Sequence, residues 1–294
     1  METAKLVTIL GPTASGKTAM GIKAAHKFGG EIICADSRTV YRGMNIGTAK
    51  PTPEEQSDVT HHLLDIANPD ELLSAAEFKK RAYGAIEDIR SRGNIPIMVG
   101  GSGMYIDSVL YDYSFRSDIS AAEKSALEGL SLVELQSIAK EKYPEKFSEI
   151  DVKNRRRVEQ LISKGPSKDS DREVNKVNSL VMGIRVEMPV LKQNIAVRTK
   201  RMLNKGFIQE VEKLRLEYGD CDILKTTTGY AEILDYLDQK IDLDKLEEAI
   251  NSSTWRLVKK QLTWFKRNDA IHWVHNYKEA STMITAYLET YNNS

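Results

Sequence analysis

The sequence predicts an α/β protein with a parallel sheet core and a mainly helical insertion. Over the first hundred residues, short β-rich runs alternate with helical patterns, and near residue 115 the strand signals stop. A returning apolar run near residue 180 brings the chain back to the core. Strands that alternate with helices form parallel sheets through right-handed crossovers. We therefore place the core at residues 1–114 and 180–294 and the helical insertion at residues 115–179.

The expected elements follow from apolar runs and from the glycine, proline and polar residues that bound them. Compact apolar runs predict strands at residues 6–10, 31–35, 95–99, 180–186 and 271–274. Periodic apolar positions predict helices at residues 17–28, 75–92, 195–216, 230–237 and 243–267. Within the insertion, residues 120–165 carry helical patterns rich in Glu, Lys and Leu, and the polar stretch 163–178 is predicted to be a loop.

Composition narrows the class of protein. The 294 residues include 42 Lys and Arg and 42 Asp and Glu, so the formal net charge is zero and a uniformly basic nucleic-acid coat is excluded. Two cysteines without a CxxC spacing predict neither a disulfide framework nor a zinc site. No apolar run reaches the roughly 20 residues of a membrane span, and the first ten residues lack a signal-peptide pattern. We expect a cytoplasmic protein, a monomer, with no membrane partner.

The clearest motif follows the first predicted strand. The segment Gly11, Pro12, Thr13, Ala14, Ser15, Gly16, Lys17, Thr18 matches the pattern G-x-x-x-x-G-K-[ST]. Its glycines let backbone N–H groups converge on phosphate oxygens, and the helix N-terminus behind them adds partial positive charge. Lys17 supplies a full charge and Thr18 a hydroxyl for a bound Mg²⁺. The motif predicts binding of a diphosphate or triphosphate. It also makes the predicted fold class more specific: α/β, with a P-loop NTPase-like parallel sheet core and a helical insertion domain.

An acidic residue follows the second predicted strand. Nucleotide triphosphatases carry an acidic metal partner at the end of a later strand, but residues 95–99 run into Gly100, Gly101 and Ser102. Asp36 follows residues 31–35, and ligands of open α/β sheets bind at such carboxyl ends. A carboxylate there can act as an outer magnesium partner or as a general base. The structural alternative is a helix N-cap formed together with Ser37.

Eight segments in order resemble one family. They read GPTASGKT at 11–18, ADSRTVYRGMNIGTAKP at 35–51, HHLLDI at 61–66, SAAEF at 74–78, VGGSGMYI at 99–106, NRRRV at 154–158, IAVRTKRML at 195–203 and QLTWFKR at 261–267. Spread over nearly the whole chain, they resemble the tRNA dimethylallyltransferase family, also called tRNA isopentenyltransferase. The resemblance implies transfer of a dimethylallyl group from dimethylallyl diphosphate to N6 of the adenosine that is 3′-adjacent to the anticodon of tRNA, with release of diphosphate.

The resemblance also implies roles for individual residues. Residues 11–18 would hold the diphosphate, with Mg²⁺ as cofactor at Thr18 and positive charge from Lys17. Asp36 would accept a hydrogen bond from the adenine amine and act as its base. Arg198 matches a family arginine and would form a second positive clamp on the diphosphate. Ser102 stands where the family usually has threonine and keeps the hydroxyl that can reach a phosphate oxygen.

Contact with tRNA is expected along the strand ends, in the insertion and on the last long helix. The candidate residues are Asp36, Ser37, Arg38, Thr39, Ser102, Arg156, Arg157, Arg256, Lys260 and Arg267. Thr39, the pair at 159–160 and the pair at 255–256 depart from the usual family pattern. By analogy with the family, the insertion would close over the anticodon arm and exclude water from the reaction.

The zero net charge conceals local basic blocks. Residues 192–205 and 255–267 each hold five basic residues and no acids, whereas residues 232–248 hold seven acids and two lysines. On a helical wheel, Arg256, Lys260 and Arg267 share one side, opposite an apolar side. An acid-free basic face favours a phosphate-backbone partner, and the alternative is an ordinary solvated face.

Other functions also fit parts of this sequence. A P-loop small-molecule kinase shares the loop and an early strand-end Asp, and an adenylate dimethylallyltransferase would act on free nucleotide. A non-catalytic tRNA-binding protein would not need Lys17, Thr18 and Asp36 together. The histidine pairs at 61–62 and at 272 and 275 lack a third metal ligand, so structural roles are favoured. For Tyr41, Tyr105 and Tyr230, stacking on a base and packing in the core both remain open.

Overall fold

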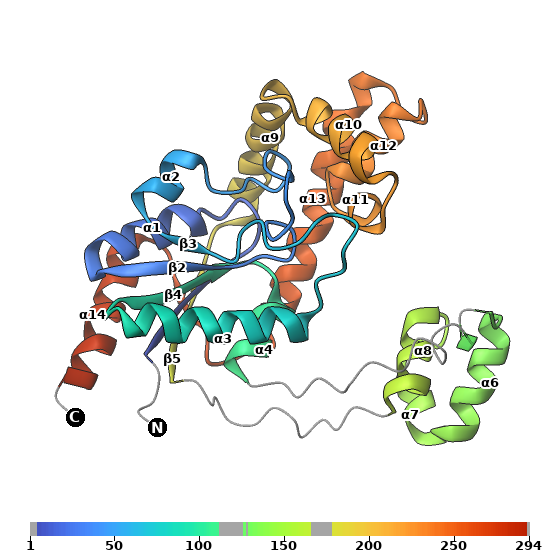
Figure 1. Cartoon of the computed structure of the whole chain (residues 1–294), viewed down its shortest axis with the longest axis horizontal. Helices are drawn as coiled ribbons and strands as arrows, with labels where there is room; N and C mark the ends of the chain where they lie inside the picture. The colour runs from blue at the N-terminus through green and yellow to red at the C-terminus, as the bar shows by residue number, and fades with distance from the viewer. Residues whose placement is uncertain (1–4, 112–125, 128, 166–177, 293–294) are drawn as a thin grey trace. The chain divides into compact units, whose positions relative to one another are not determined.

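The computed structural model describes residues 5–111, 126–127, 129–165 and 178–292 (Figure 1). The chain separates into two compact units, one made of residues 1–112 and 175–294 and the other of residues 113–174. The predicted loop at 163–178 and the start of the predicted insertion lie largely outside the described residues.

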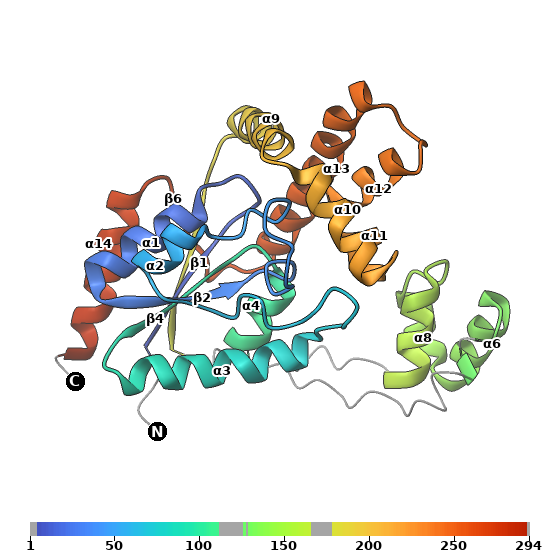
Figure 2. The same ribbon diagram turned by 45° about the horizontal axis from the view of Figure 1, so that its top comes forward.

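A parallel sheet forms the centre of the larger unit (Figures 1 and 2). Its strands are β1 (Leu6–Leu10), β2 (Gly30–Ala35), β3 (His61–His62), β4 (Ile95–Gly100), β5 (Ser179–Ile184) and β6 (His272–Val274). They lie in the order β3-β2-β4-β1-β5-β6, and every neighbouring pair is parallel. The predicted α/β class is confirmed. Because β1, β2 and β4 are adjacent, their carboxyl ends meet at one edge of the sheet.

Helices cover both faces of this sheet. The larger unit contains α1 (Lys17–Phe28), α2 (Pro53–Asp58), α3 (Ala75–Ser91), α4 (Gly103–Leu110), α9 (Met188–Asn204), α10 (Phe207–Tyr218), α11 (Asp222–Thr226), α12 (Tyr230–Leu237), α13 (Leu243–Phe265) and α14 (Tyr277–Asn292). Alternate strand residues contact α1 and α14 on one face and α3 and α4 on the other. Burial on both faces explains why the strands read as continuous apolar runs.

The prediction of one helix over residues 195–216 is wrong. The first helix, α9, begins at Met188 with Pro189 in its first turn, where a missing N–H costs nothing, and it ends at Asn204. Gly206 then adopts φ +94°, and α10 begins at Phe207. The apolar periodicity continues across this break because both helices pack on the same core. Strand β3 and the helices α2, α4, α11 and α14 were not predicted, since most are too short for a periodic signal.

Helix α13 is packed on two sides and exposed on a third. Val258 packs with Leu191 and Ile195 of α9, while Phe265 belongs to the main core. Arg256 and Lys260 are exposed, as the helical wheel predicted. The helix ends at Phe265, two residues earlier than expected. The two acid-free basic blocks therefore lie on helices that pack against each other.

The smaller unit is a helical bundle with its own core. It contains α6 (Leu132–Lys142), α7 (Pro144–Glu149) and α8 (Arg155–Lys164). Leu135 and Ala139 of α6 pack against Val158 and Leu161 of α8. Arg155 pairs with Glu159 at 2.6 Å between Nε and Oε1, one helical turn apart.

Candidate active site

The loop between β1 and α1 has the conformation that its sequence predicts. Ala14 and Gly16 adopt φ values of 66° and 85°, which turn the backbone back on itself before the helix. No side chain caps the first turn of α1, so its N–H groups are open to an anion. Within the loop, the Pro12 carbonyl accepts hydrogen bonds from Ser15 N at 3.3 Å and from Lys17 Nζ at 3.4 Å.

Polar residues from the ends of β2 and β4 lie beside this loop. The strands approach so closely that a side chain at Gly100 would collide with the carbonyl of Ala35. Ser102 Oγ accepts a hydrogen bond from Ser37 N at 2.8 Å, which joins the two strand ends. Asp36 Oδ1 accepts from Arg38 N at 2.9 Å. Asp36 therefore caps a tight turn, and the alternative of a helix N-cap is wrong because no helix begins there.

Two cations share the neighbourhood of Asp36. Burial lowers the pKa of Lys17 to about 8, with Asp36 opposing this shift and Arg198 adding to it. Burial also lowers the pKa of Arg198, and the Asp36 carboxylate opposes that shift. Arg198 Nη2 donates to the Thr48 carbonyl at 3.3 Å. The Asp36 carboxylate thus lies close enough to Lys17 and Arg198 to favour the charged form of both cations.

Two cavities meet at these residues. The smaller, about 70 Å³, is lined by the loop residues Lys17 and Thr18 and by strand ends. The larger, about 380 Å³, is lined by strand-end residues together with α9, α13 and the segment between α11 and α12. The residues that line both cavities are Thr13, Asp36, Thr48 and Arg198. The site therefore offers two compartments, and Asp36 and Arg198 lie where they adjoin.

The structure brings most of the predicted site residues together. The larger cavity is lined by Thr13, Asp36, Ser37, Arg38, Ser102, Arg198 and Lys260, and the smaller one is lined by Lys17, Thr18 and Thr39 as well. Gly11, Pro12, Ala14, Ser15 and Gly16 form the loop itself. Arg256 and Arg267 are exposed and line neither cavity, and Arg157 is exposed on α8 of the smaller unit. The side chain of Arg156 lies outside the described part of the chain.

Several residues of the site have contacts that the sequence did not predict. Gln261 of α13 accepts from Thr13 N at 2.9 Å and donates to the Gly101 carbonyl at 3.0 Å. Asn194 of α9 donates to the Ala14 carbonyl at 3.1 Å. The available signal at Gln261 was an uncharged polar residue among apolar positions of α13. Asn194 and Thr48 carried no comparable signal, because only the tertiary fold brings them to the site.

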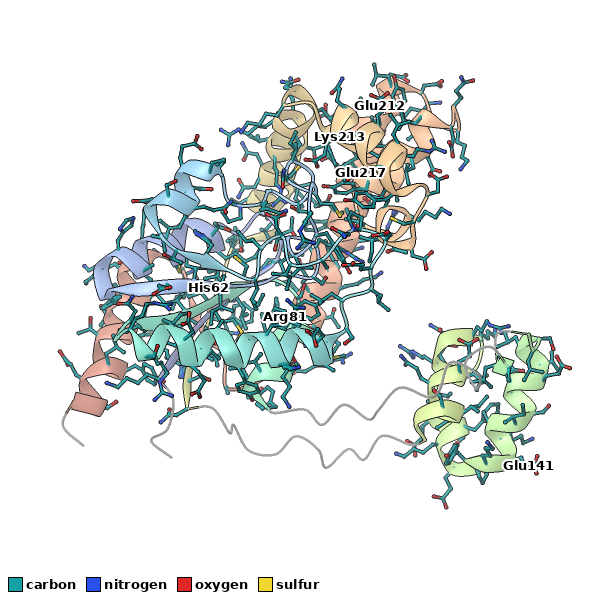
Figure 3. The ribbon with its side chains drawn as sticks, viewed as in Figure 1. His62, Arg81, Glu141, Glu212, Lys213 and Glu217 are labelled. Atoms are coloured by element: carbon teal, nitrogen blue, oxygen red, sulfur yellow. The ribbon has the colours of Figure 1, made fainter. Side chains whose placement is uncertain are left out.

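The histidines and tyrosines mostly have structural partners. His62 Nε2 lies 2.7 Å from Glu31 Oε2, and no group of three metal-ligating side chains occurs among the described residues (Figure 3 labels His62). Tyr41 and Tyr230 are fully buried in the core. Tyr105 stacks on Phe78 with ring centroids 4.0 Å apart, and it also lines the larger cavity. None of the helices in the described ranges is long and apolar enough to cross a membrane.

The fold and the site define a P-loop α/β protein with an anion-binding loop and an adjoining second compartment. The family model described as IPP transferase matches residues 39–268, and the chain belongs to this family. The tRNA dimethylallyltransferase of Macrococcus caseolyticus is 39% identical over 284 residues, which cover 93% of this chain and 91% of that protein. The enzyme of the same name from Staphylococcus carnosus is 37% identical over 97% of this chain and 94% of its own length. The resemblance seen in the sequence is confirmed.

Solved structures agree with this assignment. The full-length tRNA isopentenylpyrophosphate transferase from Bacillus halodurans superposes with a TM-score of 0.76 at 32% identity, covering 99% of this chain and 98% of that one. The tRNA delta(2)-isopentenylpyrophosphate transferase from Staphylococcus epidermidis gives 0.73 at 33% identity, covering 97% and 99%. A eukaryotic dimethylallyltransferase at 23% identity shares the fold, with a TM-score of 0.77.

Proposed function

We propose that this chain transfers a dimethylallyl group from dimethylallyl diphosphate to N6 of the adenosine that is 3′-adjacent to the anticodon of tRNA. Family membership and relatives named for this activity support the reaction class. The observation that carries the proposal is the meeting of two cavities at Asp36 and Arg198. Transfer of a group from a small diphosphate donor to one nucleotide of a tRNA needs two approaches to one reacting centre, with a base and a charge clamp between them.

The smaller compartment suits the diphosphate of the donor. Lys17 and Thr18 line it, and the uncapped first turn of α1 offers further N–H donors. With a pKa of about 8, Lys17 is mostly protonated at pH 7, and a bound diphosphate would favour the charged form further. Arg198 adds a second cation at the boundary with the larger compartment. Such preorganised charge stabilises a departing diphosphate more than it stabilises the bound substrate.

The same compartment suits a magnesium ion. The Thr18 hydroxyl and the Asp36 carboxylate both line it, and Mg²⁺ prefers oxygen ligands with several positions left to phosphates and water. We propose that Thr18 holds the ion directly. When bound, Mg²⁺ would neutralise part of the charge that develops on the leaving diphosphate.

Asp36 is the proposed general base. One of its oxygens accepts the Arg38 N–H, and among the described residues the other has no hydrogen-bond partner. That oxygen can accept a proton from the adenine amine while the amine lone pair forms the new N–C bond to C1 of the dimethylallyl group. The C1–O bond breaks at the same centre, and its electron pair leaves with the diphosphate. Atoms and charge balance without water or a second nucleotide.

The larger compartment suits the acceptor adenosine. The side chains of Ser37, Arg38 and Ser102 line it and can contact the base or its sugar, and Trp264 adds an aromatic wall. A loop adenosine must leave its stack to enter, at a cost of a few kcal/mol. Lys260 lines the cavity and Arg256 lies one turn away on the exposed face of α13, where phosphates of the RNA can be neutralised. We propose that the insertion contacts the anticodon arm through exposed residues such as Arg157.

We propose that the protein acts as a monomer in the cytoplasm, where tRNA is available. The direct test uses labelled dimethylallyl diphosphate with unmodified tRNA, with adenosine monophosphate, or with each plus ATP. We expect label at the adenosine beside the anticodon and an equal amount of released diphosphate. Label only in the free nucleotide, or phosphate transfer from ATP, would contradict the proposal and support the two alternatives.

A further inference from the structure

Two side-chain amides brace the phosphate-binding loop from the outside. The Gln261 side chain bridges the loop at Thr13 and the strand-end turn at Gly101, with distances of 2.9 and 3.0 Å. The Asn194 amide holds the next carbonyl of the loop, that of Ala14, at 3.1 Å. These contacts join segments separated by 248, 160 and 180 positions in the chain. The loop is therefore held by two distant helices as well as by its own sequence.

The Gln261 contact is a closely fitted one. A Cβ added at Gly101 would lie 2.6 Å from Gln261 Nε2, so the amide occupies the space that only glycine leaves open. Thr13 N can only donate and the Gly101 carbonyl can only accept, so the orientation of the amide is fixed. This bond commits the Thr13 N–H to Gln261 Oε1 on α13. Gly101 in turn precedes Ser102, which ties the ends of β2 and β4 together.

The two bracing residues belong to the helices that carry the basic blocks. Gln261 follows Lys260, and Asn194 lies one turn before Arg198. Val258 of α13 packs on Leu191 and Ile195 of α9, so a displacement of one helix is transmitted to the other. An RNA that neutralises the exposed face of α13 would restrict the motion of both helices, and through the amides it would restrict the loop.

We propose that Gln261 is a positioning residue that couples RNA binding on α13 to the conformation of the phosphate-binding loop. This inference rests on the proposed function, because it takes the partner of α13 to be RNA. A loop that is already ordered by one ligand loses less conformational entropy when it binds the second, so the two ligands bind with positive cooperativity. Thermodynamic coupling is reciprocal, and factors of about 5 to 150 are typical.

The test measures coupling by binding alone. Calorimetry gives the Kd of inorganic diphosphate with Mg²⁺, in the absence and presence of a saturating unmodified anticodon stem-loop RNA. For the unsubstituted protein we expect the RNA to tighten diphosphate binding by about fivefold or more. Gln261→Met keeps the length of the side chain and removes both hydrogen bonds, so this factor should fall close to one while RNA still binds.

Two further variants separate positioning from loss of structure. Thr263→Ala is the matched control, because Thr263 is exposed on the same helix and, within the described part of the chain, its hydroxyl bonds only to the Lys259 carbonyl. It should keep the full coupling factor. Asn194→Ala removes one exposed hydrogen bond and should reduce the factor partly, and it serves as the test if Gln261→Met lowers Tm by more than a few degrees.

The outcomes distinguish the inference from the proposed function. Full coupling in Gln261→Met or, if that variant is unstable, in Asn194→Ala would overturn the inference and leave the proposed function intact. Coupling absent from the unsubstituted protein would do the same. If the stem-loop RNA does not bind at all, the proposed tRNA acceptor is wrong, and the inference is overturned together with it.

Discussion

Strand β2 carries a carboxylate at each end, and the two have very different surroundings. Glu31, near its start, is 6% exposed and accepts hydrogen bonds from His62, Arg92 and Asn94 at 2.7 to 3.0 Å. Burial alone would raise the pKa of Glu31, but these hydrogen bonds outweigh it and lower the pKa to about 2. The carboxylate of Asp36, just beyond the other end, accepts one hydrogen bond among the described residues, and Asp36 lines both cavities.

The difference separates a structural carboxylate from a reactive one. The hydrogen bonds of Glu31 satisfy both of its oxygens, so it has no remaining capacity for a substrate, and it joins β2 to β3 and to the end of α3. Asp36 keeps one oxygen without a hydrogen-bond partner among the described residues, and it lies near the cations Lys17 and Arg198. Parallel strands place their carboxyl ends at one edge, where loops can present such groups to a ligand. We therefore expect loss of the charge to reduce turnover at Asp36 and to reduce folding stability at Glu31.

The largest expected effect is at Asp36. Asp36→Asn keeps the shape and the contact with the Arg38 N–H but removes the base, so turnover should fall by about 10²- to 10⁴-fold. The Kd for diphosphate should change far less, because Lys17, Thr18 and the open first turn of α1 remain in place. Single-turnover rates and calorimetry measure the two quantities.

Asp88→Asn is the matched control for this substitution. Asp88 lies on α3 with its side chain half exposed, and it pairs with Arg92 at the opposite end of the sheet. It should keep normal turnover. Undiminished turnover of Asp36→Asn would refute the base role and would leave the outer magnesium contact as the alternative for this carboxylate.

Arg198 tests whether the charge beside Asp36 stabilises the leaving group. Arg198→Ala should reduce kcat by about 10²- to 10³-fold, because it removes a preorganised cation from the boundary of the two cavities. Arg198→Lys keeps the charge without the planar fork and should recover part of the rate. Arg81→Ala is the control, because Arg81, labelled in Figure 3, lies at an exposed position of α3. A change in KM alone would mean that Arg198 binds the donor without assisting the reaction.

For a substitution of Glu31 we expect the opposite result: a loss of folding stability without a loss of catalytic activity. Glu31→Gln should lower the free energy of unfolding by about 1.5 to 3 kcal/mol at pH 7, the range for hydrogen bonds to a charged group. At temperatures where the variant is folded, its kcat should be normal. Denaturant unfolding and steady-state assays check both, and a variant with reduced kcat and full stability would break the comparison.

The pH dependence follows from the lowered pKa of Glu31. The folded-state pKa of about 2 lies below the ordinary value of 4.5, so the carboxylate stabilises the fold fully above pH 4.5. That stabilisation is lost as the pH falls from about 4.5 toward about 2. The unfolding free energies of the parent protein and Glu31→Gln should therefore converge over this range. A constant difference would show that packing, not ionisation, explains the loss.

The same contrast explains how much the sequence revealed. Residues 11–18 and Asp36 follow strands directly, so local pattern places them, and strand adjacency then brings Asp36 to the loop. The parallel sheet was predictable because its apolar runs are continuous. The hydrogen bonds of Gln261 and Asn194 depend on how α9 and α13 pack, which no local pattern encodes. The helix break at Gly206 was missed because the periodicity of buried positions continues through it.

The smallest expected effect concerns the exposed basic residues of α13 and of the turn that follows it, and it extends the comparison from the strand ends to the surface. Replacing Lys260 and Arg267 together by alanine should weaken tRNA binding. The slope of the logarithm of the binding constant against the logarithm of the salt concentration should become shallower by about 1 to 2, because each phosphate contact contributes somewhat less than one to this slope. Replacing exposed Lys80 and Lys278 removes the same charge elsewhere and should leave the slope unchanged. Filter binding between 50 and 200 mM salt resolves these slopes. If both double variants keep the parent slope, the basic face is a solvated one, and RNA must reach Asp36 along another surface.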